Sequence, residues 1–470
     1  LKYKIKMKDQ IETINPATAE TIRSYDIMDT EAIKRITQDA RGAFGKWKNI
    51  DLSERATYMR SLGRIMRKNK EQYAKMITEE MGKPLRQSIA EIEKCAWVCD
   101  YYSEHAEPFL RDELVPTEFR KSFVSFEPLG VVACIMPWNF PFWQVMRFAA
   151  PVITAGNVAI LKHSSVCLGS SLEIAQAFRD AGFPENVFQV VLGDYRTGES
   201  LVQSDIDAVS VTGSVSTGKR VGELATRGLK KFVLELGGSD PFIVLEDADL
   251  NQTAHMAAQS RLLNTGQSCI SAKRFIVVKE VVKKFTDLFV EETKAEVVGD
   301  PMDYRTTVGP LVRENQRTTI DEQVQEARSH GAEILLGGRR IESKGFFFEP
   351  TVISKVNHDM RVLKEEVFGP VAPILVVENE EEAITEANNS EFGLGASIWT
   401  NNIEKGVRLA KRIQSGIVSV NEMVRSDPRM PFGGIKNSGI GRELSEFGIK
   451  EFVNIKSVVV KDISSRLLVE

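Results

Sequence analysis

The sequence predicts an α/β protein with two domains. From residue 123 onward, short runs of β-branched and aliphatic residues alternate with amphipathic segments at helical spacing, and a second such alternation begins after residue 269. Strands that alternate with helices need crossover connections, which favour mostly parallel sheets. The chain has 470 residues, and single hydrophobic cores stop growing at about 250–300 residues. We therefore expect two principal domains.

The composition excludes several classes of protein. Hydrophobic residues make up 42% of the chain, charged residues make up 27%, and the formal net charge is -4. Such proportions are typical of globular proteins, and a chain without a basic surplus binds nucleic acid or anionic lipid poorly. The basic start of the chain lacks the apolar stretch of a signal peptide, and no apolar run is long enough to span a bilayer. We expect a soluble, cytoplasmic protein.

Cysteine usage indicates a reducing compartment. The five cysteines are Cys95, Cys99, Cys134, Cys167 and Cys269. They are odd in number and sparse, which is unlike a disulfide framework. Cys95 and Cys99 stand four residues apart on a predicted helix, where a metal pair is conceivable, but no second Cys or His pair at zinc-site spacing accompanies them. Buried, unpaired thiols are favoured, and no metal is expected.

Residues 29–107 are predicted to be helical, and strands and helices alternate after them. Predicted strands lie at 131–135, 158–161, 188–191, 208–211, 232–236 and 242–245, with helices at 168–180 and 217–227. The second half is predicted to contain a strand at 274–278, helices at 282–297 and 314–330, and a strand at 333–336. Consecutive strand–helix–strand units are typical of half a nucleotide-binding domain, with the ligand at the carboxyl ends of the strands. We expect a site in the cleft between the halves.

Cys269 is the candidate nucleophile. It follows Asn-Thr-Gly-Gln-Ser at 264–268, and such small and polar neighbours leave a thiol accessible. An ordinary thiol with a pKa of about 8.5 is weakly ionised at neutral pH, so it needs a favourable environment to react. Judged from these neighbours alone, catalysis and inert packing stay equally open.

Two polar residues stand in apolar or rigid segments. Glu235 interrupts an apolar strand that ends at Gly237 and Gly238. Burial would raise the pKa of its carboxyl and suit it to take a proton from water or a thiol, and a strand-end glutamate facing solvent is the alternative. Asn139 lies between two prolines, where its amide could donate a preorganised hydrogen bond to an oxyanion. Taken by itself, that segment favours an ordinary turn.

Six segments together resemble the aldehyde dehydrogenase superfamily. They are Pro-Trp-Asn-Phe-Pro at 137–141, Val-Thr-Gly-Ser at 211–214, Leu-Glu-Leu-Gly-Gly at 234–238, Gly-Gln-Ser-Cys at 266–269, Glu-Glu-Val-Phe-Gly-Pro at 365–370 and Pro-Phe-Gly-Gly-Ile-Lys at 431–436. The similarity runs from about residue 14 to residue 460. It implies a Rossmann-type cofactor domain at 1–109 and 129–236, an α/β catalytic domain at 237–438, and a small β oligomerisation arm at 110–128 and 453–462. A homo-oligomer, dimer or tetramer, is also implied.

The resemblance implies a covalent mechanism for the oxidation of an aldehyde. The Cys269 thiolate would add to the aldehyde, and the Asn139 amide and the Cys269 backbone N–H would hold the oxyanion of the adduct. Transfer of a hydride to a nicotinamide would leave a thioester on Cys269. Water deprotonated by Glu235 would then hydrolyse this thioester.

The same resemblance implies a set of cofactor-binding residues. They are Trp138, Lys162, Ser165, Gly213, Ser214, Glu366 and Phe368. NAD-preferring relatives carry an acid three residues after the lysine, where a carboxylate bonds the ribose and would repel a 2′-phosphate. This chain has Ser165 there, so we expect NADP to be preferred, with NAD as an alternative. Read without the family, residues 212–214 depart from the glycine-rich dinucleotide pattern and are equally a plain βα turn.

Arg147 indicates the substrate. It lies six residues after Pro141, where succinate-semialdehyde dehydrogenases carry an arginine for the distal carboxylate, and a guanidinium meets a carboxylate with two parallel bonds. Some relatives add a second arginine where this chain has Leu263, and Arg425 and Arg429 are the expected substitutes. Succinate semialdehyde is the expected substrate. A structural arginine at 147, and a broader specificity for short aliphatic or hydroxy-aldehydes, are the alternatives.

Three other functions fit only part of this pattern. A cysteine hydrolase needs a histidine beside its thiol, and none of the five histidines stands in a motif that suggests pairing with Cys269. An acylating dehydrogenase, which passes the acyl group to coenzyme A, has no need of Glu235 to activate water. A non-catalytic nucleotide-binding protein has no use for Cys269, Glu235 and Asn139 together.

Overall fold

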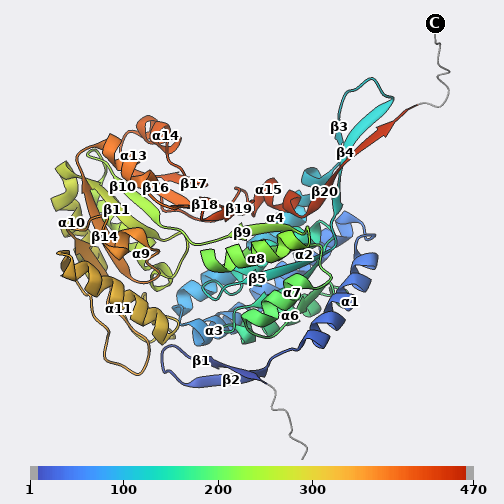
Figure 1. Ribbon diagram of the computed structural model, residues 1–470, viewed down its shortest axis with the longest axis horizontal. Coiled ribbons are helices and arrows are strands. Elements are labelled where there is room, and N and C mark those ends of the chain that lie inside the picture. The colour runs from blue at the N-terminus through green and yellow to red at the C-terminus, as the bar shows by residue number, and fades with distance from the viewer. Residues whose placement is uncertain (1–8, 462–470) are drawn as a thin grey trace, which may run out of the picture.

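The structure, a computed structural model, describes residues 9–461. Two sheets flanked by helices form the body of the molecule, and a three-stranded sheet stands away from it (Figure 1). The α/β class predicted from the sequence is confirmed. Residues 1–8 of the predicted cofactor domain and residue 462 of the predicted arm lie outside the described residues.

The first sheet has six strands in the order β19-β9-β8-β5-β6-β7. They are β5 (Val131–Met136), β6 (Val158–His163), β7 (Phe188–Val190), β8 (Ala208–Thr212), β9 (Lys231–Glu235) and β19 (Gly439–Ile440). Neighbouring strands are parallel except β19, which is antiparallel to β9. The chain runs from β5 outward through β6 and β7, then returns to β8 on the other side of β5. Open α/β sheets bind ligands at such a reversal of strand order.

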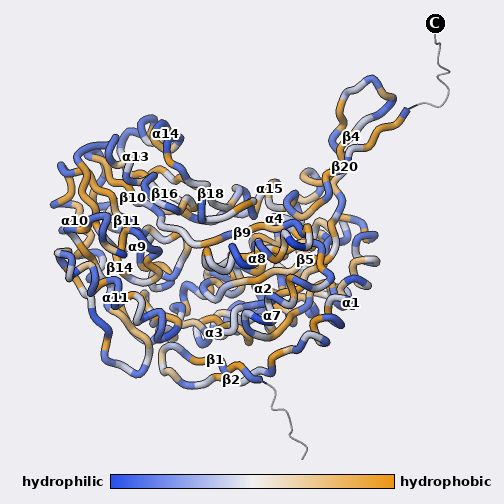
Figure 2. The backbone as a smooth tube through the Cα atoms, in the orientation of Figure 1, coloured by the Kyte–Doolittle hydropathy of each residue, from blue (hydrophilic) through white to orange (hydrophobic). Residues whose placement is uncertain are grey.

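Helices cover this sheet on both faces. They are α1 (Thr30–Trp47), α2 (Leu52–Lys68), α3 (Lys70–Met81), α4 (Leu85–Leu110), α5 (Trp143–Thr154), α6 (Leu168–Asp180), α7 (Tyr195–Gln203) and α8 (Val215–Arg227). The strands and the apolar helix faces form one continuous core, and the strands are largely orange in Figure 2. α5 is buried along its whole length. Its polar residues, Gln144, Arg147 and Thr154, therefore need partners inside the protein.

The second sheet has seven strands in the order β12-β13-β14-β11-β10-β16-β17, and only β12 and β13 pair antiparallel. They are β10 (Asp240–Val244), β11 (Ala272–Val278), β12 (Glu333–Leu336), β13 (Thr351–Ser354), β14 (Val371–Val377), β16 (Gly395–Trp399) and β17 (Ile417–Val420). Its helices are α9 (Leu250–Leu262), α10 (Lys279–Lys294), α11 (Glu314–Ser329), α12 (Arg361–Lys364), α13 (Glu380–Asn388) and α14 (Ile403–Ala410). α9 and α10 pack on one face, and α13 and α14 pack on the other.

Shorter elements connect segments that are far apart in the chain. They are the hairpin β1 (Gln10–Ile14) and β2 (Thr21–Asp26), the pair β15 (Phe392–Gly393) and β18 (Ile435–Lys436), the 3₁₀ helix η1 (Leu263–Gly266) and α15 (Ser445–Glu451). The turn of the hairpin reaches the second half, because the N–H of Phe346 donates to the Pro16 carbonyl at 2.9 Å. The projecting sheet consists of β3 (Glu113–Leu114), β4 (Lys121–Pro128) and β20 (Val453–Val460).

Most predicted strands agree with the structure within two residues at each end. The helix predicted at 282–297 is displaced, since α10 starts directly after β11 at Lys279 and ends at Lys294. Its N-cap, Val278, has no capping side chain, so the usual sequence signal for a helix start is missing. Val297 lies in extended chain and accepts hydrogen bonds from the N–H groups of Thr307 and Val308. The domain limits remain a prediction.

The structure also bears on the cysteines, on a metal site and on membrane-spanning helices. Cys95 and Cys99 are buried and free, and no group of three or more potential metal ligands occurs within residues 9–461. None of the helices in that range is long and apolar enough to cross a membrane.

Candidate active site

The carboxyl ends of the first sheet carry several of the predicted site residues. Asn139 follows β5, Lys162 lies near the end of β6, Gly213 follows β8, and Glu235 ends β9. Because these strands are parallel neighbours, their ends lie along one edge of the sheet. Cys269 comes from the second half of the chain, in the loop between η1 and β11.

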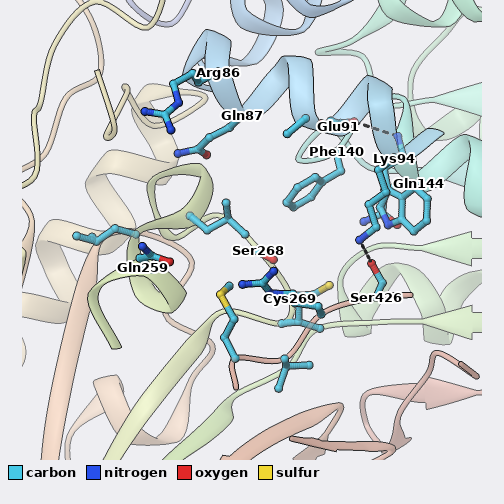
Figure 3. A pocket seen from close by; sticks show the side chains of 18 of the residues that line it. Arg86, Gln87, Glu91, Lys94, Phe140, Gln144, Gln259, Ser268, Cys269 and Ser426 are labelled. Carbon is cyan, nitrogen blue, oxygen red and sulfur yellow. Dashed lines mark hydrogen bonds between the residues drawn. The ribbon is translucent and has the colours of Figure 1, made fainter. Parts of the chain in front are cut away.

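A cavity of about 610 Å³ opens beside Cys269 (Figure 3). Its walls come from α4, α5, the segment from α9 to residue 270, and the loop at 423–432. The charged lining residues are four basic ones, Arg86, Lys94, Arg147 and Arg425, and two acidic ones, Glu91 and Glu296. The aromatic lining residues are Phe140, Trp143 and Phe432. Apolar walls with a surplus of basic groups suit a small organic anion.

The loop that presents Cys269 is strained and is held by amide side chains. The residues at 264–266 have φ values of 53°, 58° and 74°, a conformation that costs energy at the two residues that are not glycine. Asn264 Nδ2 donates to the carbonyls of Asn139 at 2.8 Å and Gln267 at 3.1 Å. Asn139 Nδ2 also donates to the Gln267 carbonyl at 3.1 Å. These bonds join the Cys269 loop to the segment after β5.

The electrostatic surroundings of Cys269 are mixed. Burial raises the pKa of its thiol to about 11, while the positive charges of Arg147 and Lys273 lower it and the Glu366 carboxylate raises it. Lys273 Nζ donates to the carbonyls of Ser268 at 2.9 Å and Cys269 at 2.7 Å. With this pKa the thiol keeps its proton at neutral pH, so a nearby positive charge or proton acceptor is needed to generate the thiolate.

The raised pKa predicts how Cys269 is alkylated in the protein without ligands. Only the thiolate reacts with iodoacetamide, so the rate constant at Cys269 should rise about tenfold per pH unit between pH 7 and pH 10. Mass spectrometry of the modified peptide measures this rate, and Cys269→Ala gives the background from the other four thiols. A plateau near the pKa of free cysteine, about 8.5, would contradict the assignment.

Asn139 is buried, with 4% of its surface exposed. Its Nδ2 uses one proton for the Gln267 carbonyl, and a side-chain amide has two. The second proton is not used by that bond, and Asn139 itself is not one of the residues that line the cavity. Asn139 therefore retains the hydrogen-bonding capacity that an oxyanion site needs.

Glu235 is buried but does not line the cavity. Neither carboxyl oxygen has a hydrogen-bond partner among the described residues. Burial raises the pKa of Glu235 well above the ordinary value, and the negative charge of Glu443 raises it further. A Cβ at Gly433 would lie 2.5 Å from Glu235 Oε1, so only glycine leaves room for the carboxyl at this position. The structure places Cys269 on the cavity wall, whereas Glu235 is not part of that wall.

Arg147 lines the cavity and also contacts buried side chains of the protein. Its Nε forms an ion pair with Glu443, and both side chains are at most 4% exposed. Its Nη2 donates to Thr212 Oγ1 at 3.4 Å, and the guanidinium carbon lies 4.3 Å from the centre of the Phe432 ring. The structural role that the sequence left open for Arg147 is thus present, and a substrate role depends on the N–H groups that these contacts leave free, which are on Nη1 and at the second hydrogen of Nη2.

The Arg147–Glu443 pair predicts a stability effect. Arg147→Met leaves the Glu443 carboxylate buried without its partner, which should lower the free energy of unfolding by about 3–5 kcal/mol. Adding Glu443→Gln removes the unpaired charge and should recover most of the loss. Urea unfolding followed by tryptophan fluorescence compares the variants, and a double variant no more stable than Arg147→Met would contradict the pairing.

Lys162 and Ser165 form a basic and polar group at the end of β6. Lys162 is 6% exposed, and its Nζ has no hydrogen-bond or ion-pair partner within residues 9–461. Burial lowers the pKa of Lys162 to about 8, and the Asp194 charge opposes this shift. Ser165 Oγ accepts a hydrogen bond from Arg313 Nη2 at 3.3 Å. Arg313 is the residue immediately before α11, so both halves of the chain contribute a cation near Ser165.

The turn after β8 leads directly into α8. The N–H of Gly213 donates to the Glu235 carbonyl at 3.0 Å, and Ser214 caps α8 by accepting from the N–H of Thr217 at 3.2 Å. The start of a helix carries unpaired N–H groups and a partial positive charge, which favour a phosphate. This position at the reversal of strand order is suited to a dinucleotide.

Trp138, Glu366 and Phe368 do not line the cavity. The Trp138 and Phe368 rings meet edge to face, with centroids 5.7 Å apart. Glu366 Oε1 accepts from the N–H of Gly238 at 3.1 Å and lies 3.3 Å from Lys273 Nζ. The structure thus joins the predicted segment at 365–370 to the end of β9.

The two arginines expected to replace a second substrate arginine differ in position. Arg425 lines the cavity, but its side chain is 60% exposed and pairs with Glu422 at 3.2 Å. Arg429 does not line the cavity. It pairs with Asp427 at 2.6 Å and lies 5.4 Å from the centre of the Trp97 ring.

Four residues near the site were not found from the sequence: Lys94, Arg313, Ser426 and Glu443. Lys94 had a usable signal, because it stands beside the buried positions of a long amphipathic helix, where a lysine is unusual. For the other three, the contacts join chain segments more than a hundred residues apart: Arg313 with Ser165, Ser426 with Lys94, and Glu443 with Arg147.

Comparison with known proteins adds a further observation. Residues 4–458 match the profile of the aldehyde dehydrogenase family. The chain is 43% identical over 447 residues to an Escherichia coli K12 protein named succinate semialdehyde dehydrogenase NAD(P)+ Sad, covering 95% of this chain and 97% of that protein. It is 41% identical over 447 residues to a Deinococcus radiodurans protein named succinate-semialdehyde dehydrogenase NADP(+), with coverage of 95% and 94%. A solved structure of succinic semialdehyde dehydrogenase from Streptococcus pyogenes with NADP+ has a TM-score of 0.94 and 36% identity, covering 96% of this chain and 100% of that one.

Proposed function

The chain belongs to the aldehyde dehydrogenase family, and from this premise we propose that it oxidises succinate semialdehyde to succinate with NADP+ as the electron acceptor. The observation that carries the proposal is the position of Cys269 on the wall of a cavity with more basic than acidic lining residues. Relatives named for this substrate cover nearly the whole chain. A nucleophile, an apolar wall and a basic surplus together suit an aldehyde that carries a carboxylate at its other end.

Each of three residues has a proposed chemical role. The Cys269 thiolate adds to the aldehyde carbon, and the resulting oxyanion accepts hydrogen bonds from Asn139 Nδ2 and the Cys269 backbone N–H. The oxidised adduct is a thioester on Cys269. Glu235 takes a proton from the water that hydrolyses it, and the raised pKa of this carboxyl makes it a stronger base than an ordinary glutamate.

The residues around the strand ends of the first sheet suit the binding of NADP. Lys162 has a buried ammonium without a partner among the described residues, Ser165 and Arg313 stand together, and residues 162–165 contain no acid. These groups would hold the adenosine ribose and its 2′-phosphate, and the start of α8 at Ser214 would hold the diphosphate. When bound, the nicotinamide supplies the acceptor for the hydride that the aldehyde carbon loses.

The nucleophile is tested by Cys269→Ala. Because the thiol forms the covalent bond to the substrate, kcat for succinate semialdehyde should fall by about 10³-fold or more, while the thermal unfolding midpoint stays near that of the parent. The ultraviolet absorbance of reduced NADP follows the reaction. Cys99→Ala, at a buried thiol of α4, is the matched control and should keep the parental kcat. Parental turnover in Cys269→Ala would overturn the proposed function.

The cofactor preference is tested by Ser165→Glu. A carboxylate at this position repels the 2′-phosphate of NADP and can bond the ribose hydroxyls of NAD, so the ratio of kcat/KM for NADP to that for NAD should fall at least about tenfold. Ser165→Ala removes the hydroxyl without adding charge and should change the ratio much less. Steady-state kinetics with both cofactors give these ratios, and an unchanged ratio in Ser165→Glu would contradict the placement of the phosphate.

We also propose that the enzyme is a cytoplasmic homo-oligomer. The sheet of β3, β4 and β20 projects from the body (Figure 1) and carries exposed apolar side chains, among them Leu114, Ile455 and Val459. Apolar groups in an extended arm are expected to be covered by another subunit. The five free thiols support a reducing location.

A further inference from the structure

Lys94 on α4 points its ammonium group into the cavity beside Cys269. Figure 3 shows the side chain directed at Ser426, and Lys94 Nζ donates to Ser426 Oγ at 2.7 Å. The ammonium also lies 4.4 Å from the centre of the Trp143 ring. Both neighbours line the same cavity. Within residues 9–461, Lys94 has no carboxylate partner.

The nearby acids are already engaged by other groups. Glu91, one turn earlier on α4, pairs with the buried Lys83 and accepts hydrogen bonds from the N–H groups of Phe142 and Trp143. Asp427 pairs with Arg429. A partly buried ammonium without a counter-ion is unfavourable unless something else supplies the negative charge.

We propose that Lys94 is the cation that binds the distal carboxylate of the substrate, a role that rests on the function proposed above. The Ser426 hydroxyl accepts from Lys94 and still has its own proton to donate. A carboxylate in the cavity would therefore receive one charge-assisted bond from Lys94 Nζ and a second bond from Ser426. The class of substrate is an aldehyde with an ω-carboxylate.

The other basic residues of the cavity are less suited to this role. The charge of Arg147 is opposed by its ion pair with Glu443, and Arg425 is largely exposed and pairs with Glu422. Arg86 is exposed and lies over the Tyr304 ring at 5.9 Å. Lys94 is thus the basic residue of the cavity that is best suited to bind the carboxylate.

The titration of Lys94 provides a readout that a structural role would not give. Burial, together with the smaller effect of the positive charge of Arg147 on α5, lowers the pKa of Lys94 to about 8, and Cys95, Asp427 and Glu91 oppose this shift. The ammonium form exists below this pKa and is lost as the pH rises through it. The KM for an anionic aldehyde should therefore rise above pH 8, whereas the KM for a neutral aldehyde should not follow this titration.

The test compares succinate semialdehyde with butanal, a neutral aldehyde of the same carbon number. Lys94→Met keeps the apolar stem over Trp143 and removes the charge. The KM for succinate semialdehyde should rise about ten- to hundredfold with little change in kcat, as expected for the loss of one hydrogen bond to a charged group. The kinetics of butanal should be unchanged. Lys94→Arg keeps a cation and should restore most of the affinity without the change above pH 8.

Lys70→Met is the matched control, because Lys70 is an exposed lysine on α3 that pairs with Glu93. It should leave both substrates unaffected. With an active parent enzyme, an equal loss for both aldehydes in Lys94→Met, or an unchanged KM for succinate semialdehyde, would overturn the role of Lys94 alone. A parent chain that oxidises neither aldehyde would instead overturn the proposed function.

Discussion

The hydrogen bonds between the segment after β5 and the Cys269 loop are the constraint on which the site depends. Asn139 and Asn264 both donate to the Gln267 carbonyl, and Asn264 also donates to the Asn139 carbonyl. They hold residues 264–266 in a left-handed conformation that an isolated loop would leave. The nucleophile comes from one half of the chain and the amide from the other, so their relative position exists only when the two halves are docked.

Buried charges connect the groups around this loop. Arg147 pairs with Glu443, and Glu443 in turn raises the pKa of Glu235. Arg147 also lowers the pKa of the Cys269 thiol, although burial has the larger effect. In a medium of low dielectric constant such effects act strongly over several ångströms. A change at any one of these residues is therefore expected to shift the protonation of the others.

Substrate and cofactor are assigned to different parts of the molecule. The cavity is lined by α4, α5 and the loop at 423–432, whereas Lys162, Ser165 and Ser214 lie at the strand ends of the first sheet and do not line it. Cys269 itself lies on the cavity wall. This separation is consistent with a covalent adduct that is reached by the aldehyde from one side and by the nicotinamide from the other.

The sequence by itself determined the parallel strands, because these depend on local information, and it indicated the candidate nucleophile through its resemblance to a family. Buried strands such as β5 and β8 are short apolar runs bounded by turns, and Cys269, Glu235 and Asn139 stand in recognisable segments. Where a local signal was weak, as at the uncapped start of α10, the predicted limits were displaced.

Only the tertiary structure decided the surroundings of these residues. The Lys94–Ser426 bond joins residues 332 positions apart, and the Arg147–Glu443 and Ser165–Arg313 contacts also join distant segments. No periodicity or motif encodes such pairs, because they arise from the packing of helices and loops against each other. The charge inside the cavity is therefore a property of the fold, and the proposed preference for an aldehyde with a carboxylate rests on it.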